Sequence, residues 1–381
     1  RQNIALLATV LCSVDLMTIV RCTQARMDSL SVLVTFAACL AYLTQREKSL
    51  ARALFFGNSL AAFGMIVHPN GLFGVAGITL LEIFYDRKSL RPAHLFWFGL
   101  PYVIVGAAYG LYALQEPQAW AQQLGGHASG RANGILHPLD SIVAEITQRY
   151  FTSFGFAPGA TLERKLYILT LVPYAVAPLI CLFDRRIRRM PGVAFLLASF
   201  WVIQFYFTFL EGGKYYAYLL HIMPYYTCFV AIAAVHLFLE KPGWRPVVMA
   251  VLGALVLFQV GGAAMTIRQN IAHNIYKDVV QRMDARLIAS RHETVLGPSE
   301  FGFYFGFDHV RDDRSSRSLV TERPLYAIIP LVPYARLEDE AAKWAPLVSA
   351  TLNDCYEPPE VIGPFELYRR KPSCSAGRLA P

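Results

Sequence analysis

Four polar side chains lie at the ends of two apolar stretches near the start of the chain. Arg26 and Asp28 come just before the first stretch, and His68 and Asn70 follow the second, in the turn H-P-N-G. Arg26 can bind a phosphate while Asp28 orients that phosphate or a sugar hydroxyl. Asp28 can equally cap a helix, and Pro and Gly are expected in a tight turn. An imidazole is not needed for such a turn, so His68 is the residue that suggests chemistry.

A second group of polar side chains follows a later apolar stretch. Glu211 and Lys214 belong to the sequence E-G-G-K-Y-Y, and Tyr218 comes four residues after Lys214. Tyrosines often anchor a protein at a membrane surface, and a lysine there can extend its amine towards water. An acid, a base and several phenols on the side that carries His68 favour a binding site.

The composition is that of a membrane protein. Of the 381 residues, 55% are hydrophobic and only 16% are charged, whereas soluble domains carry about 25% charged residues. We therefore expect an α-helical polytopic membrane protein with about nine spans. The apolar runs are 4–20, 29–45, 52–68, 71–86, 95–115, 166–183, 192–210, 217–239 and 246–265.

Lysines and arginines concentrate in every second turn between these runs, and such turns normally face the cytoplasm. The opposite side then receives all the polar residues named above and everything after Arg268. The net charge of +8 is spread over short turns, so we expect no nucleic-acid partner. The basic residues of the inner turns are Arg46, Lys48, Arg52, Arg87, Lys88, Arg91, Arg185, Arg186, Arg188, Arg189, Lys241 and Arg245.

The long outer loop, 115–165, contains an amphipathic stretch. Ile142, Ile146, Tyr150 and Phe154 recur at four-residue spacing. This pattern predicts a helix over 139–154 that lies in the membrane interface on its apolar face.

Residues 269–381 form a second domain in this interpretation, after a transmembrane domain of residues 1–268. Helices are expected at about 271–287 and 337–352, with short strands at 294–296, 327–331 and 365–368, which indicates a small extracytoplasmic α/β domain. No phosphate-binding glycine motif is present, so we expect no nucleotide site. Cys355 and Cys374 either form a disulfide or remain free thiols, depending on the compartment.

The motifs resemble those of polytopic glycosyltransferases of the GT-C type, which use lipid-phosphate sugars. These include the protein O-mannosyltransferases and the aminoarabinose transferase of lipid A. Arg26, Asp28 and Leu30 match their R-x-D-x-L, and Lys214, Tyr218 and Pro224 match their K-x3-Y-x5-P spacing. The loop sequence E-I-T-Q-R-Y-F-T-S-F-G is similar to their amphipathic loop.

The resemblance implies transfer of a sugar from a polyprenyl-phosphate donor to a protein, lipid or glycan acceptor at the outer face of a bacterial inner membrane. It also implies that the donor phosphate is bound by Arg26, Lys214 and Arg149, and the polyprenyl tail by apolar grooves between the spans, with membrane lipids as further partners. The family's catalytic acid lies in a loop that would precede Arg1, where we expect a larger protein to continue. Asp28 matches a different position, so the catalytic residue is unknown.

Two other classes compete with this interpretation. A transporter or lipid-handling protein would keep polar groups near the middle of its spans, and only Asp15 and Glu82 are candidates here. A non-catalytic subunit on the same scaffold would lack the acid altogether. No His, Asp and Glu set has convincing metal-ligand spacing in the sequence, so we expect no metal and no other cofactor.

Overall fold

The computed structural model divides the chain into two compact units, Arg1–Met265 and Thr266–Pro381. The division lies three residues before the predicted boundary. The structure describes residues 2–22, 27–118, 120–121, 135–156, 162–272, 276–287, 294–298, 301–306, 308–313, 316–331 and 339–374.

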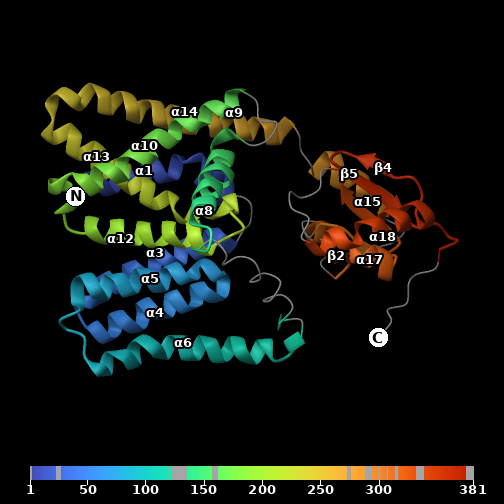
Figure 1. Cartoon of the computed structure of the whole chain (residues 1–381), viewed down its shortest axis with the longest axis horizontal. Helices are drawn as coiled ribbons and strands as arrows, with labels where there is room; N and C mark the ends of the chain where they lie inside the picture. Colours follow the sequence, from blue (N-terminus) through green and yellow to red (C-terminus); the bar gives the residue numbers. More distant parts are fainter. Residues whose placement is uncertain are drawn as a thin grey trace. The chain divides into compact units, whose positions relative to one another are not determined.

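Unit 1 is a bundle of helices (Figure 1). Its long helices are α1 (Gln2–Val14), α2 (Leu16–Cys22), α3 (Met27–Arg46), α4 (Leu50–Val67), α5 (Leu72–Leu81), α6 (Pro92–Ala113), α10 (Leu171–Phe183), α12 (Val193–Phe205), α13 (Met223–Glu240) and α14 (Arg245–Ala272). Shorter elements join them: η1 (Pro69–Gly71), η2 (Glu82–Asp86), α8 (Pro138–Ala144), η4 (Glu145–Phe156), α9 (Leu162–Leu166), η5 (Tyr167–Thr170), α11 (Arg185–Arg188), η6 (Tyr206–Leu210), η7 (Tyr216–His221) and η8 (Pro242–Trp244).

Among the described residues, six helices are long and apolar enough to cross a membrane, or seven if the bent pair α1 and α2 forms one span. The expected count of about nine is therefore not confirmed. The difference lies in two apolar runs that fold as shorter helices. The run at 166–183 forms the helical stretch Tyr167–Phe183, and the run at 71–86 forms α5 followed by a turn of π-helix.

The α3–α4–α5 hairpins pack closely because small residues line their contacts. Ala38, Ala53 and Ala62 are fully buried between these helices, as in other membrane helix pairs, where small residues let backbones approach. Gly71 shows the tightest approach, since a Cβ there would lie 2.2 Å from the carbonyl carbon of Gly64. Any other residue would force apart the turn that holds His68 and Asn70.

The break between α1 and α2 bends the first apolar segment by 59°. Asp15 occupies the break and is fully buried. Its carboxylate accepts hydrogen bonds from the Tyr174 hydroxyl at 2.9 Å, the Gln259 amide at 3.0 Å and the Thr18 backbone N–H at 2.7 Å. These donors satisfy the carboxylate internally, which is the requirement for a buried acid in an apolar bundle.

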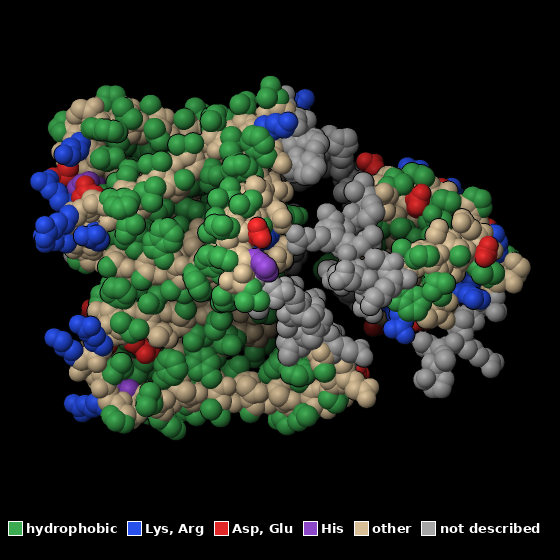
Figure 2. All heavy atoms as spheres, in the orientation of Figure 1, with side chains coloured by type: hydrophobic (Ala, Val, Ile, Leu, Met, Phe, Trp, Pro, Cys, Tyr) green, Lys and Arg blue, Asp and Glu red, His purple; other side chains and the backbone are tan. Residues whose placement is uncertain are grey.

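Most of the lysines and arginines on the visible face of unit 1 gather at one end, over the turns that join α3 to α4, η2 to α6, α10 to α12 and α13 to α14 (Figure 2). We call this the basic end. Arg46 forms an ion pair there with Asp86, at 2.7 Å, and the Tyr42 hydroxyl donates to the same carboxylate. Asp28, His68 and Lys214 lie at the opposite ends of these helices. The alternation of basic and non-basic turns in the sequence predicts this arrangement.

Unit 2 contains a five-stranded sheet in the order β2-β1-β3-β5-β4. Its strands are β1 (Val295–Leu296), β2 (Val310–Arg311), β3 (Tyr326–Pro330), β4 (Glu360–Ile362) and β5 (Phe365–Arg369). The first three run parallel, and β5 and β4 are antiparallel to their neighbours. The helical elements of this unit are η9 (Tyr276–Val280), α15 (Gln281–Leu287), α16 (Gly302–Phe305), α17 (Arg317–Thr321) and α18 (Asp339–Cys355), which gives the expected α/β architecture.

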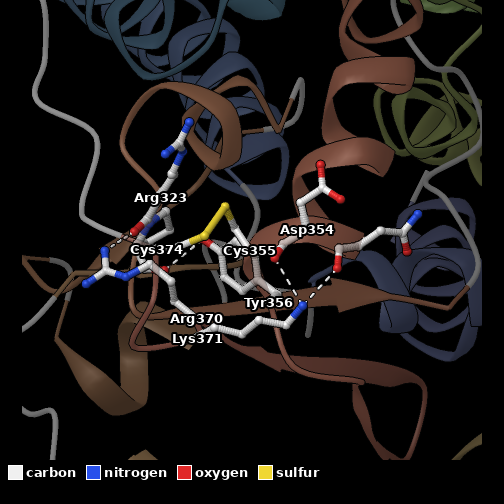
Figure 3. The surroundings of a disulfide bond; sticks show 9 residues. Arg323, Asp354, Cys355, Tyr356, Arg370, Lys371 and Cys374 are labelled. Carbon is white, nitrogen blue, oxygen red and sulfur yellow. Dashed lines mark hydrogen bonds between the residues drawn. A yellow bond between two sulfur atoms is a disulfide. The ribbon is translucent and has the colours of Figure 1, made fainter.

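A disulfide joins Cys355, at the end of α18, to Cys374 beyond β5 (Figure 3). The two Cα atoms are 5.4 Å apart, which falls in the range for a disulfide. The chain around it is held by further bonds, because the Lys371 amine donates to the carbonyls of Asn353 and Asp354 at 3.0 Å. The structure thus favours the paired alternative.

We predict that the Cys355→Ser, Cys374→Ser double variant weakens unit 2 without changing unit 1. Closing a loop of this length stabilises a fold by about 3 kcal/mol, so the variant's second unit should be cut faster in limited proteolysis of the whole protein. Cys22→Ser, which removes an exposed free thiol, is the control. Reaction of Cys355 and Cys374 with a maleimide in the unreduced native protein would contradict the pairing.

Candidate functional site

Asp28 and His68 meet although forty residues separate them. Asp28 lies in the first turn of α3, and His68 lies at the junction of α4 and η1. The Nε2 atom of His68 is 3.4 Å from Oδ1 of Asp28, and the Asp28 side chain is 2% exposed. The start of a helix suits a carboxylate because the helix dipole stabilises its negative charge.

His221 and Asn70 also contact this pair. Nε2 of His221 is 3.7 Å from Oδ1 of Asp28 and 3.3 Å from the side-chain nitrogen of Asn70. Both residues are buried. Burial lowers the pKa of His221 below its usual value, because the charged imidazolium loses its hydration. His221 is therefore a neutral imidazole at neutral pH.

Aromatic rings surround these polar groups. The Tyr218 ring contacts the His68 ring edge to face, with centroids 5.6 Å apart, and it stacks on Phe207 at 5.8 Å. Phe73 contacts His221 at 5.3 Å. We call Asp28, His68, Asn70, Tyr218 and His221 the polar centre. Its residues come from three turns that are distant in sequence.

Asp28, His68 and His221 each offer one atom that could bind a metal ion, and these atoms lie within 4.8 Å of one another. A carboxylate with two imidazoles is a ligand set that suits zinc. The hydrogen bonding of His68 opposes this use. Its Nδ1 accepts a bond from the Asn70 backbone N–H at 3.1 Å, so in the neutral ring the proton sits on Nε2.

A metal ligand needs a bare Nε2 and normally donates from its other ring nitrogen. The Nε2–H of His68 instead faces Asp28. In this geometry the pair is an acid and a base in close contact, and a metal would bind only after the Asn70 turn released Nδ1. The absence of a metal therefore stays a prediction, although the residues are closer together than the sequence suggested.

A second buried cluster adjoins the polar centre. Arg149, fully buried in η4, forms ion pairs with Glu145 at 2.7 Å and with Glu211 at 2.6 Å. The amine of Lys214 lies 3.3 Å from the other oxygen of Glu145. We call Glu145, Arg149, Glu211 and Lys214 the ion cluster. Its two positive and two negative side chains balance.

Burial affects both Glu145 and Lys214. It raises the pKa of the Glu145 carboxyl and lowers the pKa of the Lys214 amine, and in each residue the charge of the other partly offsets the shift. Arg149 also donates to the Tyr215 carbonyl at 2.6 Å and lies over the Phe207 ring at 4.7 Å. Internal partners therefore compensate its charge.

The turn that carries Lys214 has an unusual backbone. Lys214 has a φ of 47°, in the left-handed region that costs energy for a residue other than glycine. Its amine donates to the carbonyls of Phe207 and Thr208, at 2.8 and 2.5 Å, and these bonds hold the turn. A Cβ on Gly213 would lie 2.6 Å from a carboxylate oxygen of Glu211, so a larger residue there would displace the Glu211 side chain.

The structure brings most of the predicted site residues together. Asp28, His68, Asn70 and Tyr218 form the polar centre, and Arg149, Glu211 and Lys214 belong to the ion cluster. Phe207 joins the two groups, since it contacts both Tyr218 and Arg149. Arg26 lies outside the described residues.

Two residues of the site were not among the predicted ones. His221 lies three residues after Tyr218, on the 3₁₀-helix η7, and this spacing could have identified it. Glu145 lies four residues before Arg149, which is the spacing of an ion pair on a helix.

The amphipathic stretch is helical, as predicted, in α8 and η4, but its four apolar residues do not share one environment. Ile142 and Ile146 are 40% and 45% exposed, whereas Glu145 and Arg149 are buried with Tyr150 and Phe154. The reason is local. From Glu145 the chain follows a π-helix, whose hydrogen bonds span five residues and rotate the faces, and each buried charge has a partner of opposite sign.

Comparisons with known proteins give no family for this chain: no family model, no curated protein and no solved structure matches it.

We predict that Arg149→Ala destabilises unit 1 strongly. Removing one partner from a buried ion cluster costs about 3–5 kcal/mol, because the remaining charges stay buried without compensation. The melting temperature of the protein in detergent should fall by several degrees or more.

A rescue variant separates this effect from a loss of ligand binding. Replacing Glu211 by glutamine in the Arg149→Ala background removes the uncompensated charge, keeps Lys214 paired with Glu145 and should recover part of the lost stability. If Arg149→Ala melts like the wild type, the ion cluster does not support the fold.

Proposed function

We propose that unit 1 is a glycosyltransferase domain that moves a sugar from a polyprenyl-phosphate donor to an acceptor at the outer membrane face. One observation carries the proposal. Asp28, His68, Asn70, Tyr218 and His221 come from three separate turns and contact one another at the ends of the helices opposite the basic turns. Buried polar groups at such a position in a membrane protein are costly and are usually functional.

The chemistry of the polar centre suits a sugar phosphate. Amide, phenol and imidazole groups bind sugar hydroxyls, and Asp28 accepts hydrogen bonds from them. We assign Asp28, in the first turn of α3, to binding of the donor and not to deprotonation of the acceptor hydroxyl.

The phosphate-binding role proposed for Arg149 and Lys214 needs refinement. Glu145 and Glu211 already neutralise these two cations, so they support the site and leave little free charge for a phosphate. Arg26 is then the candidate for the donor phosphate. The polyprenyl tail would lie against exposed apolar faces of the spans, in contact with membrane lipids.

A transporter is the main alternative, and the break between α1 and α2 is the feature that favours it, because transporters bind substrates at broken helices. The carboxylate at this break is Asp15, and it already accepts hydrogen bonds from three donors of unit 1. A non-catalytic subunit on the same scaffold is the third alternative.

The proposed location is the bacterial inner membrane, with unit 2 on the extracytoplasmic side. The basic turns support this orientation through the positive-inside rule. The Cys355–Cys374 disulfide supports it independently, since disulfides persist in the oxidising periplasm and are rare in the cytosol.

The test is a transfer assay on the full-length protein in membranes, with polyprenyl-phosphate sugars as donors. Asp28→Asn keeps the size of the side chain and removes its charge, and it should lower transfer about ten- to a hundredfold, as expected for a lost charge-assisted contact. Glu116→Gln, which changes an exposed carboxylate beyond α6, is the matched control and should retain full activity.

Full transfer by Asp28→Asn in a folded protein contradicts the proposed site. Binding of the donor without any transfer by the full-length wild type favours the non-catalytic subunit.

A further inference from the structure

A small cavity lies at the basic end of unit 1, at the ends of α4 and α5 opposite to the polar centre. It has a volume of about 180 Å³ and lies between the start of α4, the end of α5 and the start of α6. Since one water molecule occupies about 30 Å³ in the liquid, the cavity has room for a small polar group.

Glu82 forms the inner wall of this cavity and is 8% exposed. Its Oε1 atom is buried and has no hydrogen-bond partner among the described residues. The Asn58 side chain hydrogen-bonds to the Glu82 carboxyl, and it also donates to the Leu54 carbonyl at 2.7 Å and accepts from Tyr102 at 2.7 Å. A buried carboxylate oxygen without a donor is costly, and most such atoms have a partner.

The outer wall of the cavity has the opposite charge. Arg91 lines it and is exposed, at the position where the chain enters α6. Thr79 adds a hydroxyl to the inner side. A ligand that fills the space therefore meets a carboxylate inside and a guanidinium near the surface.

The rest of the wall is apolar and continues onto the outside of the bundle. Leu95 and Phe98 line the cavity from α6, and Leu95 is 72% exposed. Only 6% of the apolar window of α6 is buried, and this helix lies at the edge of the bundle beside α4 (Figure 1). Acyl chains can therefore lie along α6 directly next to the polar cavity.

We propose that this cavity binds the headgroup of a zwitterionic phospholipid that carries a primary amine, such as phosphatidylethanolamine. The ammonium group donates to Glu82, the phosphate lies beside Arg91, and the acyl chains follow Leu95 and Phe98. The position fits, because the basic end is where the lipid headgroups of that leaflet meet the protein. A trimethylammonium headgroup has no N–H to donate, and an anionic glycerol headgroup places no cation at the carboxylate.

The test uses the whole purified protein, incubated with equal amounts of phosphatidylethanolamine, phosphatidylcholine and phosphatidylglycerol, with the bound lipids counted by native mass spectrometry. The wild type should retain phosphatidylethanolamine about tenfold over phosphatidylcholine, as expected for a charge-assisted hydrogen bond. Glu82→Gln should reduce this ratio to about one. Glu47→Gln changes an exposed carboxylate in the α3–α4 turn of the same end and should leave the ratio unchanged.

A measurement on the wild type alone keeps the proposal testable if Glu82→Gln fails to fold. A phosphatidylethanolamine analogue with a photoreactive group near the amine should label peptides from residues 79–98. Equal retention of the three lipids by the wild type, or preferential retention of phosphatidylglycerol, overturns the proposal and indicates that Glu82 is simply a protonated, neutral acid. Labelling spread evenly over all lipid-facing helices overturns it as well.

Discussion

The ion cluster around Arg149 is the interaction on which the rest of the membrane unit depends. A fully buried guanidinium is tolerated only because Glu145 and Glu211 pair with it, at 2.7 and 2.6 Å. These pairs attach the π-helix η4 to the turn after η6, and Lys214 strengthens the attachment through Glu145. The turn can then keep the left-handed backbone of Lys214, which is unfavourable by itself. A costly set of buried charges thus fixes the geometry of a loop at the end of the bundle.

The polar centre follows from that loop. Phe207 lies under the guanidinium of Arg149 and stacks on Tyr218, so the ion cluster sets the position of η7 and of His221 at its end. The α3–α4–α5 hairpins supply the other half of the site, through Asp28 and His68. The close packing of small residues in these hairpins brings His68 to Asp28. Two kinds of constraint, paired charges and close helix contacts, therefore meet at one place, where the proposed function needs a rigid set of hydrogen-bonding groups.

The sequence predicted the coarse fold because the signals for it are local. Apolar runs, basic turns and three of the five described strands of unit 2 can be identified within windows of a few residues, whereas β2 and β4 were not predicted. The same reasoning found Asp28, His68 and Lys214, since polar residues at the ends of apolar runs stand out. It did not predict that Ile142 and Ile146 differ in burial from Tyr150 and Phe154, because a π-helix changes which residues share a face, and periodicity assumes an α-helix. Partnerships across long separations, such as His221 with Asp28 or Arg149 with Glu211, depend on packing that no short window contains.

The central claim is that the polar centre binds a polyprenyl-phosphate sugar, and photo-crosslinking tests it most directly. A polyprenyl phosphate with a photoreactive group beside the phosphate would be added to the full-length protein in membranes, and the labelled peptides would be identified by mass spectrometry. Labels on the peptides that contain residues 68–73 and 211–221, removed by an excess of unlabelled polyprenyl phosphate, are the expected result. Labels confined to the lipid-exposed faces of α6 and α14, and unaffected by competition, would contradict the claim.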